Sequence, residues 1–220
     1  MLTRYNWTMQ KYFGKYVDFQ TASKADAGAL LGADIAVGDV CDIEIDLEDG
    51  VHKAWITNKA GQRVAFFDSK FSRKLSLLAA DGLIEKAILS FVAFTDHPDD
   101  GHYWGQAAVV CYGAPYAQEF DKFVDNVAAK IGSDVRPRID FDAEAVDKVI
   151  DSGGTWMPTQ NVTLPDMQKG AAIIKRRRSV TDKLIDQGRA GNKGCYLASW
   201  AFLLAVVALI VFGFKSCLGW

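Results

Sequence analysis

The densest cluster of side chains that could do chemistry lies in residues 95–102, Thr-Asp-His-Pro-Asp-Asp-Gly-His. It contains two imidazoles and three carboxylates between two apolar segments. These groups bind zinc and other divalent metals, and they also serve as general acids and bases. The candidate catalytic residues are Asp96, His97, Asp99, Asp100 and His102. Among these, the candidate metal ligands are His97, Asp100 and His102.

A hairpin loop explains the same residues with fewer assumptions. Pro98 fixes φ at the second position of a type I turn, and Gly101 suits the left-handed conformation that closes a longer loop. His52 is the one other histidine in the sequence, so a metal site would need carboxylates or water to complete it. We therefore favour a structural loop, with a metal-dependent enzyme as the alternative. No cofactor is indicated.

A second candidate site is a basic run, which consists of Lys175, Arg176, Arg177 and Arg178. Residues 166–193 carry 8 Lys/Arg and 3 Asp/Glu, a net charge of +5, whereas residues 1–165 carry 16 and 24, a net charge of −8. Each basic residue close to an anionic membrane surface contributes about 1 kcal/mol of binding. We predict that these four residues contact anionic lipid. A solvated helix face and a signal for membrane orientation are the alternatives.

Residues 195–214 form an uncharged apolar run of 20 residues. A helix of this length extends about 30 Å, the thickness of a bilayer hydrocarbon core. The excess of basic residues before the run places the preceding domain on the cytoplasmic side, and the N-terminus lacks the pattern of a signal peptide. The sequence therefore predicts a single-pass membrane protein with residues 1–193 in the cytoplasm and a short tail, 215–220, on the far side.

Small residues share one face of this predicted transmembrane helix. They are Ala198, Ala201, Ala205 and Ala208. A seam of small residues lets two helix backbones approach closely in lipid, which favours a homodimer. Because alanine is common in membrane spans, a span without such pairing is the alternative.

The elements that position these groups follow from hydrophobic periodicity and turn residues. Aromatic residues at helical spacing predict a helix over residues 1–20. Alternation predicts strands over 41–48, 51–57, 63–68, 86–95 and 103–112, and helices are expected over 25–31, 69–80, 116–131, 141–150 and 166–187. The fold class is α+β: a small antiparallel five-stranded sheet or partly open barrel with flanking helices, plus one C-terminal transmembrane helix. The expected domains are residues 1–165, a basic juxtamembrane helix and Gly-rich joint at 166–194, the span at 195–214 and the tail at 215–220.

The first predicted strand has one acidic face, formed by Asp42, Glu44, Asp46 and Glu48. A solvated face that prevents edge-to-edge pairing is the favoured interpretation. A docking surface for a basic partner and a cation site are the alternatives.

Cys41 and Cys111 fall inside predicted strands, where we expect them to be small buried hydrophobic residues and not a disulfide.

Between residues 38 and 82 the spacing of certain residues resembles the small-barrel pattern of HIRAN domains, although the Asn-Pro-x-x-Asp element of that family is missing. The residues are Gly38-Asp39, Gly61, Ala65-Phe66-Phe67, Ser72, Leu75 and Gly82. This resemblance implies a nucleic-acid-binding barrel. We place that function behind the others because residues 1–165 are acidic and the aromatic residues are not interleaved with the basic ones. The leading expectation is a membrane-anchored interaction or scaffolding module with a protein partner.

Overall fold

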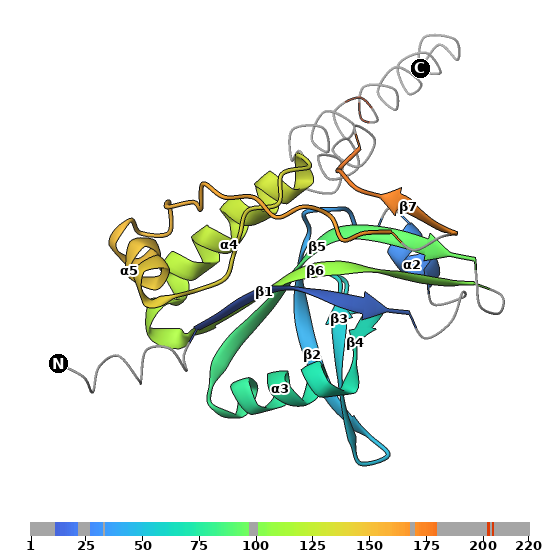
Figure 1. Ribbon diagram of the computed structural model, residues 1–220, viewed down its shortest axis with the longest axis horizontal. Coiled ribbons are helices and arrows are strands. Elements are labelled where there is room, and N and C mark those ends of the chain that lie inside the picture. Colours follow the sequence, from blue (N-terminus) through green and yellow to red (C-terminus); the bar gives the residue numbers. More distant parts are fainter. Residues whose placement is uncertain are drawn as a thin grey trace, which may run out of the picture. The chain divides into compact units, whose positions relative to one another are not determined.

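The computed structural model describes residues 12–21, 27–32, 34–96, 101–167 and 170–179, together with Phe202 and Leu204. The chain divides into two compact units, Met1–Arg178 and Ser179–Trp220. In the first unit the described residues form an antiparallel β-barrel with several helices packed on it (Figure 1).

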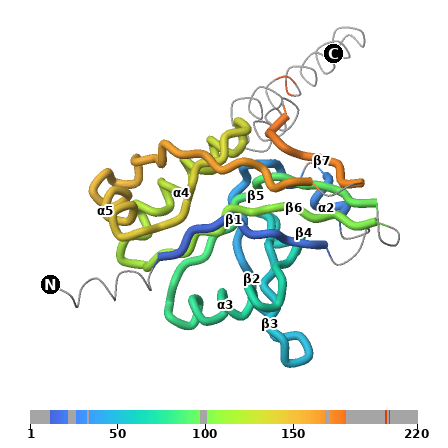
Figure 2. The backbone as a smooth tube through the Cα atoms, in the orientation of Figure 1, coloured from blue at the N-terminus to red at the C-terminus, as the bar shows by residue number. Residues whose placement is uncertain are grey.

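Six strands close the barrel. They are β1 (Tyr12–Gln20), β2 (Val40–Glu48), β3 (Val51–Thr57), β4 (Arg63–Phe67), β5 (Leu83–Thr95) and β6 (His102–Gly113). Their order is β2-β3-β4-β1-β6-β5, and β5 pairs back onto β2. The continuous path of the chain through this ring can be followed in Figure 2.

Strand β5 is long enough to pair with two different strands on one side. Its residues Lys86–Ile88 pair with β2, and Val92–Thr95 pair with β7 (Ala171–Lys175). The β5–β6 register shifts between Leu89 and Phe91, an irregularity of the kind that bends a strand. The barrel therefore carries β7 as an added edge strand from the C-terminal part of the unit.

Two hydrophobic cores hold the unit together. The barrel interior contains Phe19, Ile56 and Phe67, and it is completed by Leu30 from α2 (Ala27–Leu31) and Leu75 from α3 (Ser69–Ala80). The second core lies against the outer face of β5 and β6. Its members include Phe120, Phe123 and Val127 from α4 (Ala117–Gly132) and Val149 from α5 (Ala143–Asp151), packed against Ile88, Val110 and Tyr112.

Most of the expected elements are confirmed. The α+β class and the antiparallel pairing hold, the helix over residues 69–80 is present with the predicted bounds, and Cys41 and Cys111 are free and buried. Asp68 begins α3 by accepting a 2.9 Å hydrogen bond from the backbone N–H of Phe71 on its side chain. The turn at Asp49-Gly50 has positive φ at both residues, as a tight hairpin requires.

Three expectations are wrong. Residues 12–20 form strand β1 and not helix, because each of them has a register partner in β6. This strand joins β4 to β6, so the barrel has six strands and is closed, where a five-stranded sheet or a partly open barrel was expected. Residues 171–175 of the expected juxtamembrane helix form strand β7 on β5.

Candidate functional site

The predicted metal-binding loop is described at its two ends. Asp96 is exposed and its backbone N–H donates to the carbonyl oxygen of Gly170 at 3.3 Å, while His102 is exposed at the start of β6. His97, Asp99 and Asp100 lie outside the described residues. Within the described part of the chain, no three His, Cys, Asp or Glu side chains come together as a metal site. The metal hypothesis stays a prediction.

The basic run is held on the barrel unit at three of its four residues. Lys175 Nζ donates to the carbonyl oxygens of Gly32 at 2.7 Å and Ile35 at 2.9 Å. Arg176 pairs with Asp134 at 2.8 Å, and Arg178 pairs with Asp39. The side chain of Arg177 is exposed. Three of the four residues expected to bind lipid therefore already have protein partners, which any lipid would have to displace.

The predicted membrane segment falls almost wholly outside the description. The alanines of the proposed dimer seam (Ala198, Ala201, Ala205 and Ala208) are not among the described residues. Phe202 and Leu204 have helical backbone and are 72% and 62% exposed. Across the ranges that the structure describes, no helix has the length and apolar character needed to cross a bilayer.

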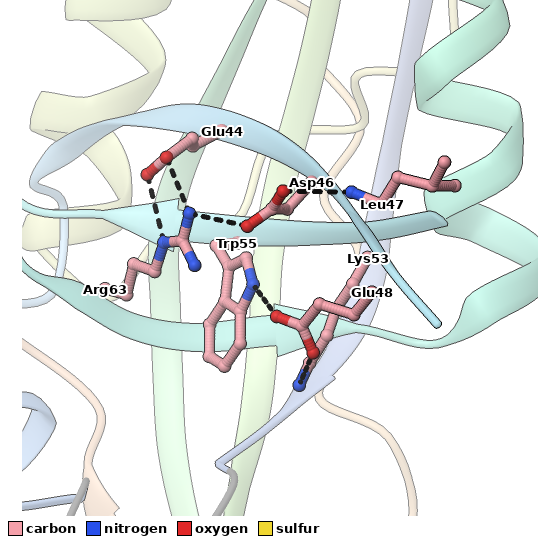
Figure 3. Close-up of polar contacts among 7 residues, drawn as sticks. All are labelled: Glu44, Asp46, Leu47, Glu48, Lys53, Trp55 and Arg63. Carbon is pink, nitrogen blue, oxygen red and sulfur yellow. Dashed lines mark hydrogen bonds and ion pairs between the residues drawn. The ribbon is translucent and has the colours of Figure 1, made fainter. Parts of the chain in front are cut away.

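The acidic side chains of β2 form ion pairs with basic side chains of the neighbouring strands. Arg63 on β4 donates to Glu44 at 2.6 and 3.1 Å and to Asp46 at 3.0 Å, as Figure 3 shows. Lys86 pairs with Asp42 at 2.6 Å, and Lys53 pairs with Glu48 at 3.0 Å. The hydrogen bonds from Arg63 lower the pKa of Glu44. Each acid of the ladder thus has a basic partner, which favours the solvated-face interpretation over a docking surface for a basic protein.

Trp55 lies at the centre of this face. Its indole N–H donates to Glu48 at 3.2 Å, and Lys53 Nζ lies 4.2 Å from the centre of its ring (Figure 3). Phe66 packs against the same ring edge-on at 5.3 Å. These contacts occupy the indole within the protein, so Trp55 is part of the barrel surface and not an open binding platform.

The candidate site that emerges from the fold is a groove between β1 and α3, which we call the β1–α3 groove. Its volume is about 540 Å³. Strand β1 pairs with β6 along all nine residues but with β4 at Phe19 and Gln20 alone. Where β4 ends, the chain turns into α3, whose Phe71 and Lys74 side chains contact the ring of Phe13. The β1–β4 pairing that closes the barrel is therefore short, and the groove lies beside the part of β1 that β4 does not reach.

The groove combines an apolar floor with basic walls. Phe13 and Phe71 are in ring contact at 5.8 Å, and Val17 lies on the same barrel-facing side of β1 as Phe13. Lys74 Nζ lies 3.6 Å from the centre of the Phe13 ring, and its burial lowers its pKa. Lys15 and Lys70 line the groove and are exposed. Such a surface suits a ligand with negative charge and some apolar area.

The two acidic residues of the groove are already engaged. Asp18 accepts a 2.7 Å hydrogen bond from Gln106 Nε2, and Asp68 caps α3. Gln106 in turn accepts from the guanidinium of Arg136, which is 6% exposed. Neither of these two carboxylates is paired with a lysine of the groove. The groove is therefore a basic site on a unit that is acidic overall.

One half-buried acid lies on β5 near the groove. Glu85 is the register partner of Cys111, which in turn is the partner of Phe13. Burial raises the pKa of Glu85 to about 7, and its Oε1 has no hydrogen-bond partner among the described residues. A carboxyl group with this pKa is partly protonated at neutral pH, so it titrates in the physiological range.

A second hollow of about 440 Å³ lies beside α5 and is lined by both acidic and basic side chains. Arg138 donates to Asp140 at 3.0 Å and to Gln160 at 3.1 Å, and Lys148 pairs with Glu144 at 2.6 Å. Trp156 in its wall stacks on Phe123. The charges are paired with each other, so this hollow has no evident preference for a charged ligand.

No family model matches the chain. Searches of curated proteins and of solved structures also return no match.

Sequence reasoning missed the β1–α3 groove for a clear reason. Its walls come from residues 13–18 and 68–74, which are far apart in the sequence, and the first of these segments was expected to be a helix. A period-two pattern was present in Phe13, Lys15, Val17 and Phe19, which share one face of β1. That pattern is the signal that could have identified the strand.

Proposed function

We propose that this chain is a single-pass membrane protein whose α+β domain faces the cytoplasm and binds a partner protein in the β1–α3 groove. The observation that carries the binding function is the groove beside the part of β1 that β4 leaves unpaired, where three lysines surround an apolar floor. The anchoring function is supported by the uncharged run 195–214 and by the basic excess that precedes it.

A binding function agrees with the way the domain is built. The other charged surface, on β2, is internally paired, so it offers little net attraction to a partner. The groove has uncommitted positive charge and about 540 Å³ of accessible space, a volume within the range of small-ligand sites or of a few residues of peptide. It is therefore the surface most suited to a specific partner.

Site-specific photo-crosslinking in cells tests the proposal. A photoreactive amino acid replaces Lys70 in the groove wall of the full chain, and in a matched chain it replaces Lys122, an exposed lysine of α4. We expect discrete crosslinked species from position 70 that are absent from position 122. Equal patterns from the two positions, or none from position 70, would reject the groove as the binding site.

Membrane fractionation tests the anchor. The full chain should stay in the membrane pellet after extraction at alkaline pH, whereas a chain ending at residue 194 should be released. Protease added to sealed vesicles with cytoplasmic side out should remove the barrel domain. Release of the full chain by alkali, or protection of the barrel, would contradict the proposed topology.

A further inference from the structure

Residues 13–18 of β1 have a strand partner on one side only. Backbone N–H and C=O groups along a strand point alternately to its two sides, so about half of these residues direct their groups away from β6. Among the described residues, no backbone hydrogen bond joins residues 13–18 to any element other than β6. The groove is therefore lined by a strand edge with free donors and acceptors.

The helix beside this edge cannot supply hydrogen-bond partners for the backbone groups of β1. The backbone groups of α3 bond within the helix, and its side chains Phe71 and Lys74 reach β1 at the ring of Phe13. Strand β4 satisfies the edge at Phe19 and Gln20 and then ends. A short extended chain placed in the groove would continue the pairing that β4 begins.

The charge and shape of the groove restrict the class of ligand that it can bind. Lys15, Lys70 and Lys74 attract negative side chains, while Phe13, Val17 and Phe71 offer an apolar floor. A single-stranded DNA backbone supplies phosphate acceptors but no donors for the free C=O groups of the strand. A polypeptide supplies donors and acceptors at strand spacing, so the edge favours a peptide over a nucleic acid.

We propose that the β1–α3 groove binds an extended acidic segment of a partner protein, which adds as a strand to the free edge of β1. The segment pairs with residues 13–18, places an apolar side chain on the Phe13–Phe71 floor and directs its carboxylates to the three lysines. This inference rests on the proposed function and names the chemistry of the partner at the same site.

The test measures binding of a fluorescent peptide to the full chain in detergent micelles. The probe is Glu-Asp-Val-Glu-Val-Asp-Glu, with both ends blocked. The first control is the same peptide with N-methyl groups on alternate residues, which removes the hydrogen-bond donors from one edge. The second is a thymidine oligonucleotide of equal charge. We expect the N-methylated peptide to bind at least tenfold more weakly, and the oligonucleotide not to displace the probe.

Matched variants locate the site. Lys15→Glu with Lys70→Glu should weaken binding of the probe at least tenfold, whereas Lys122→Glu with Lys130→Glu on α4 should leave it within twofold. All four lysines are exposed, so thermal unfolding of both variants should stay close to that of the parent chain. Hydrogen exchange followed by mass spectrometry should show new protection in residues 13–18 when the probe binds.

Three results would overturn the proposal: no binding of the probe, equal binding of the N-methylated peptide, or displacement of the probe by the oligonucleotide. These failures are distinguishable from failure of the proposed function. If position 70 gives crosslinked partners in cells while the probe fails, the groove is a binding site but strand addition by an acidic segment is wrong. If position 70 gives none, the binding function itself fails.

Discussion

The guanidinium of Arg136 lies over the ring of Tyr16, with its central carbon 4.4 Å from the ring centre. Arg136 also donates to the carbonyl oxygen of Thr163 at 2.8 Å and to Gln106 of β6. Burial lowers the pKa of this guanidinium. A single side chain thus joins the segment around residue 163 to the barrel wall that carries the groove, and planar stacking with two directed donors is a geometry that lysine cannot reproduce.

Arg136→Lys is therefore expected to lower the free energy of unfolding by about 2 kcal/mol, because a buried ammonium loses the stacking on Tyr16 and cannot reproduce the directed hydrogen bonds to Gln106 and Thr163. The matched control is Arg138→Lys, since the Arg138 side chain is 56% exposed, and we expect that change to stay within about 0.5 kcal/mol. Urea unfolding followed by tryptophan fluorescence measures both. Equal effects of the two substitutions would show that Arg136 does not hold the segment.

Glu85 is expected to make stability depend on pH. Its pKa in the folded protein, about 7, lies above its ordinary value of 4.5, so the folded state binds the proton more tightly than the unfolded chain does. The stabilisation is complete below about pH 4.5 and is lost as pH rises through 7. Glu85→Gln removes this dependence. Relative to that variant, the free energy of unfolding of the parent chain should fall by about 1–2 kcal/mol between pH 5 and pH 8. This figure includes a reduction for solvent screening, because the carboxyl group is partly exposed.

Urea unfolding at several pH values measures the difference. Asp125→Asn on the exposed side of α4 provides the control, and its stability should follow the parent chain across the same range. If Glu85→Gln also follows the parent chain at every pH, the carboxyl group is ionised throughout and its burial has no energetic consequence.

Local sequence pattern predicts strands β2 and β3 but does not decide the structure of β1. Strands β2 and β3 alternate regularly and are joined by Asp49-Gly50, so local pattern determines them. Strand β1 satisfies two patterns at once: Tyr12, Tyr16 and Phe19 match helical spacing, while Phe13, Val17 and Phe19 match strand spacing. Pairing with β6 decides between them, and that contact is between residues about ninety positions apart.

Gly14 shows the same difficulty at a single residue. In a predicted helix it is a weak point, but in β1 a Cβ atom there would overlap with the carbonyl oxygen of Ile139. The glycine is needed because the chain around Ile139 crosses the strand at that place. Strand β7 was missed for a related reason, since Ala171–Lys175 is short and its edge position depends on the unpaired half of β5.

The thiols of Cys41 and Cys111 should be unreactive in the folded protein. Burial raises the pKa of the Cys41 thiol to about 12 and raises that of Cys111 further, so almost no thiolate is present at pH 8. In a chain with Cys195→Ser and Cys217→Ser, labelling by a maleimide should be at least a hundredfold slower in buffer than in urea. Fast labelling in buffer at a single position would show that the barrel opens locally there.

The ion pairs of the basic run should compete with lipid. Arg178 and Arg176 are held by Asp39 and Asp134, so they are available to an anionic membrane only after these carboxylates release them. Asp39→Asn with Asp134→Asn removes the competing charges, and a chain ending at residue 193 should then be retained more strongly on vesicles that contain phosphatidylserine. Basic residues near such surfaces contribute about 1 kcal/mol each, so two released arginines should raise retention tenfold or more.

Asp140→Asn is the control, because its partner, Arg138, lies outside the run. If the double variant and the control bind these vesicles equally, and no better than neutral ones, the basic run serves to hold β7 on the barrel and does not bind lipid.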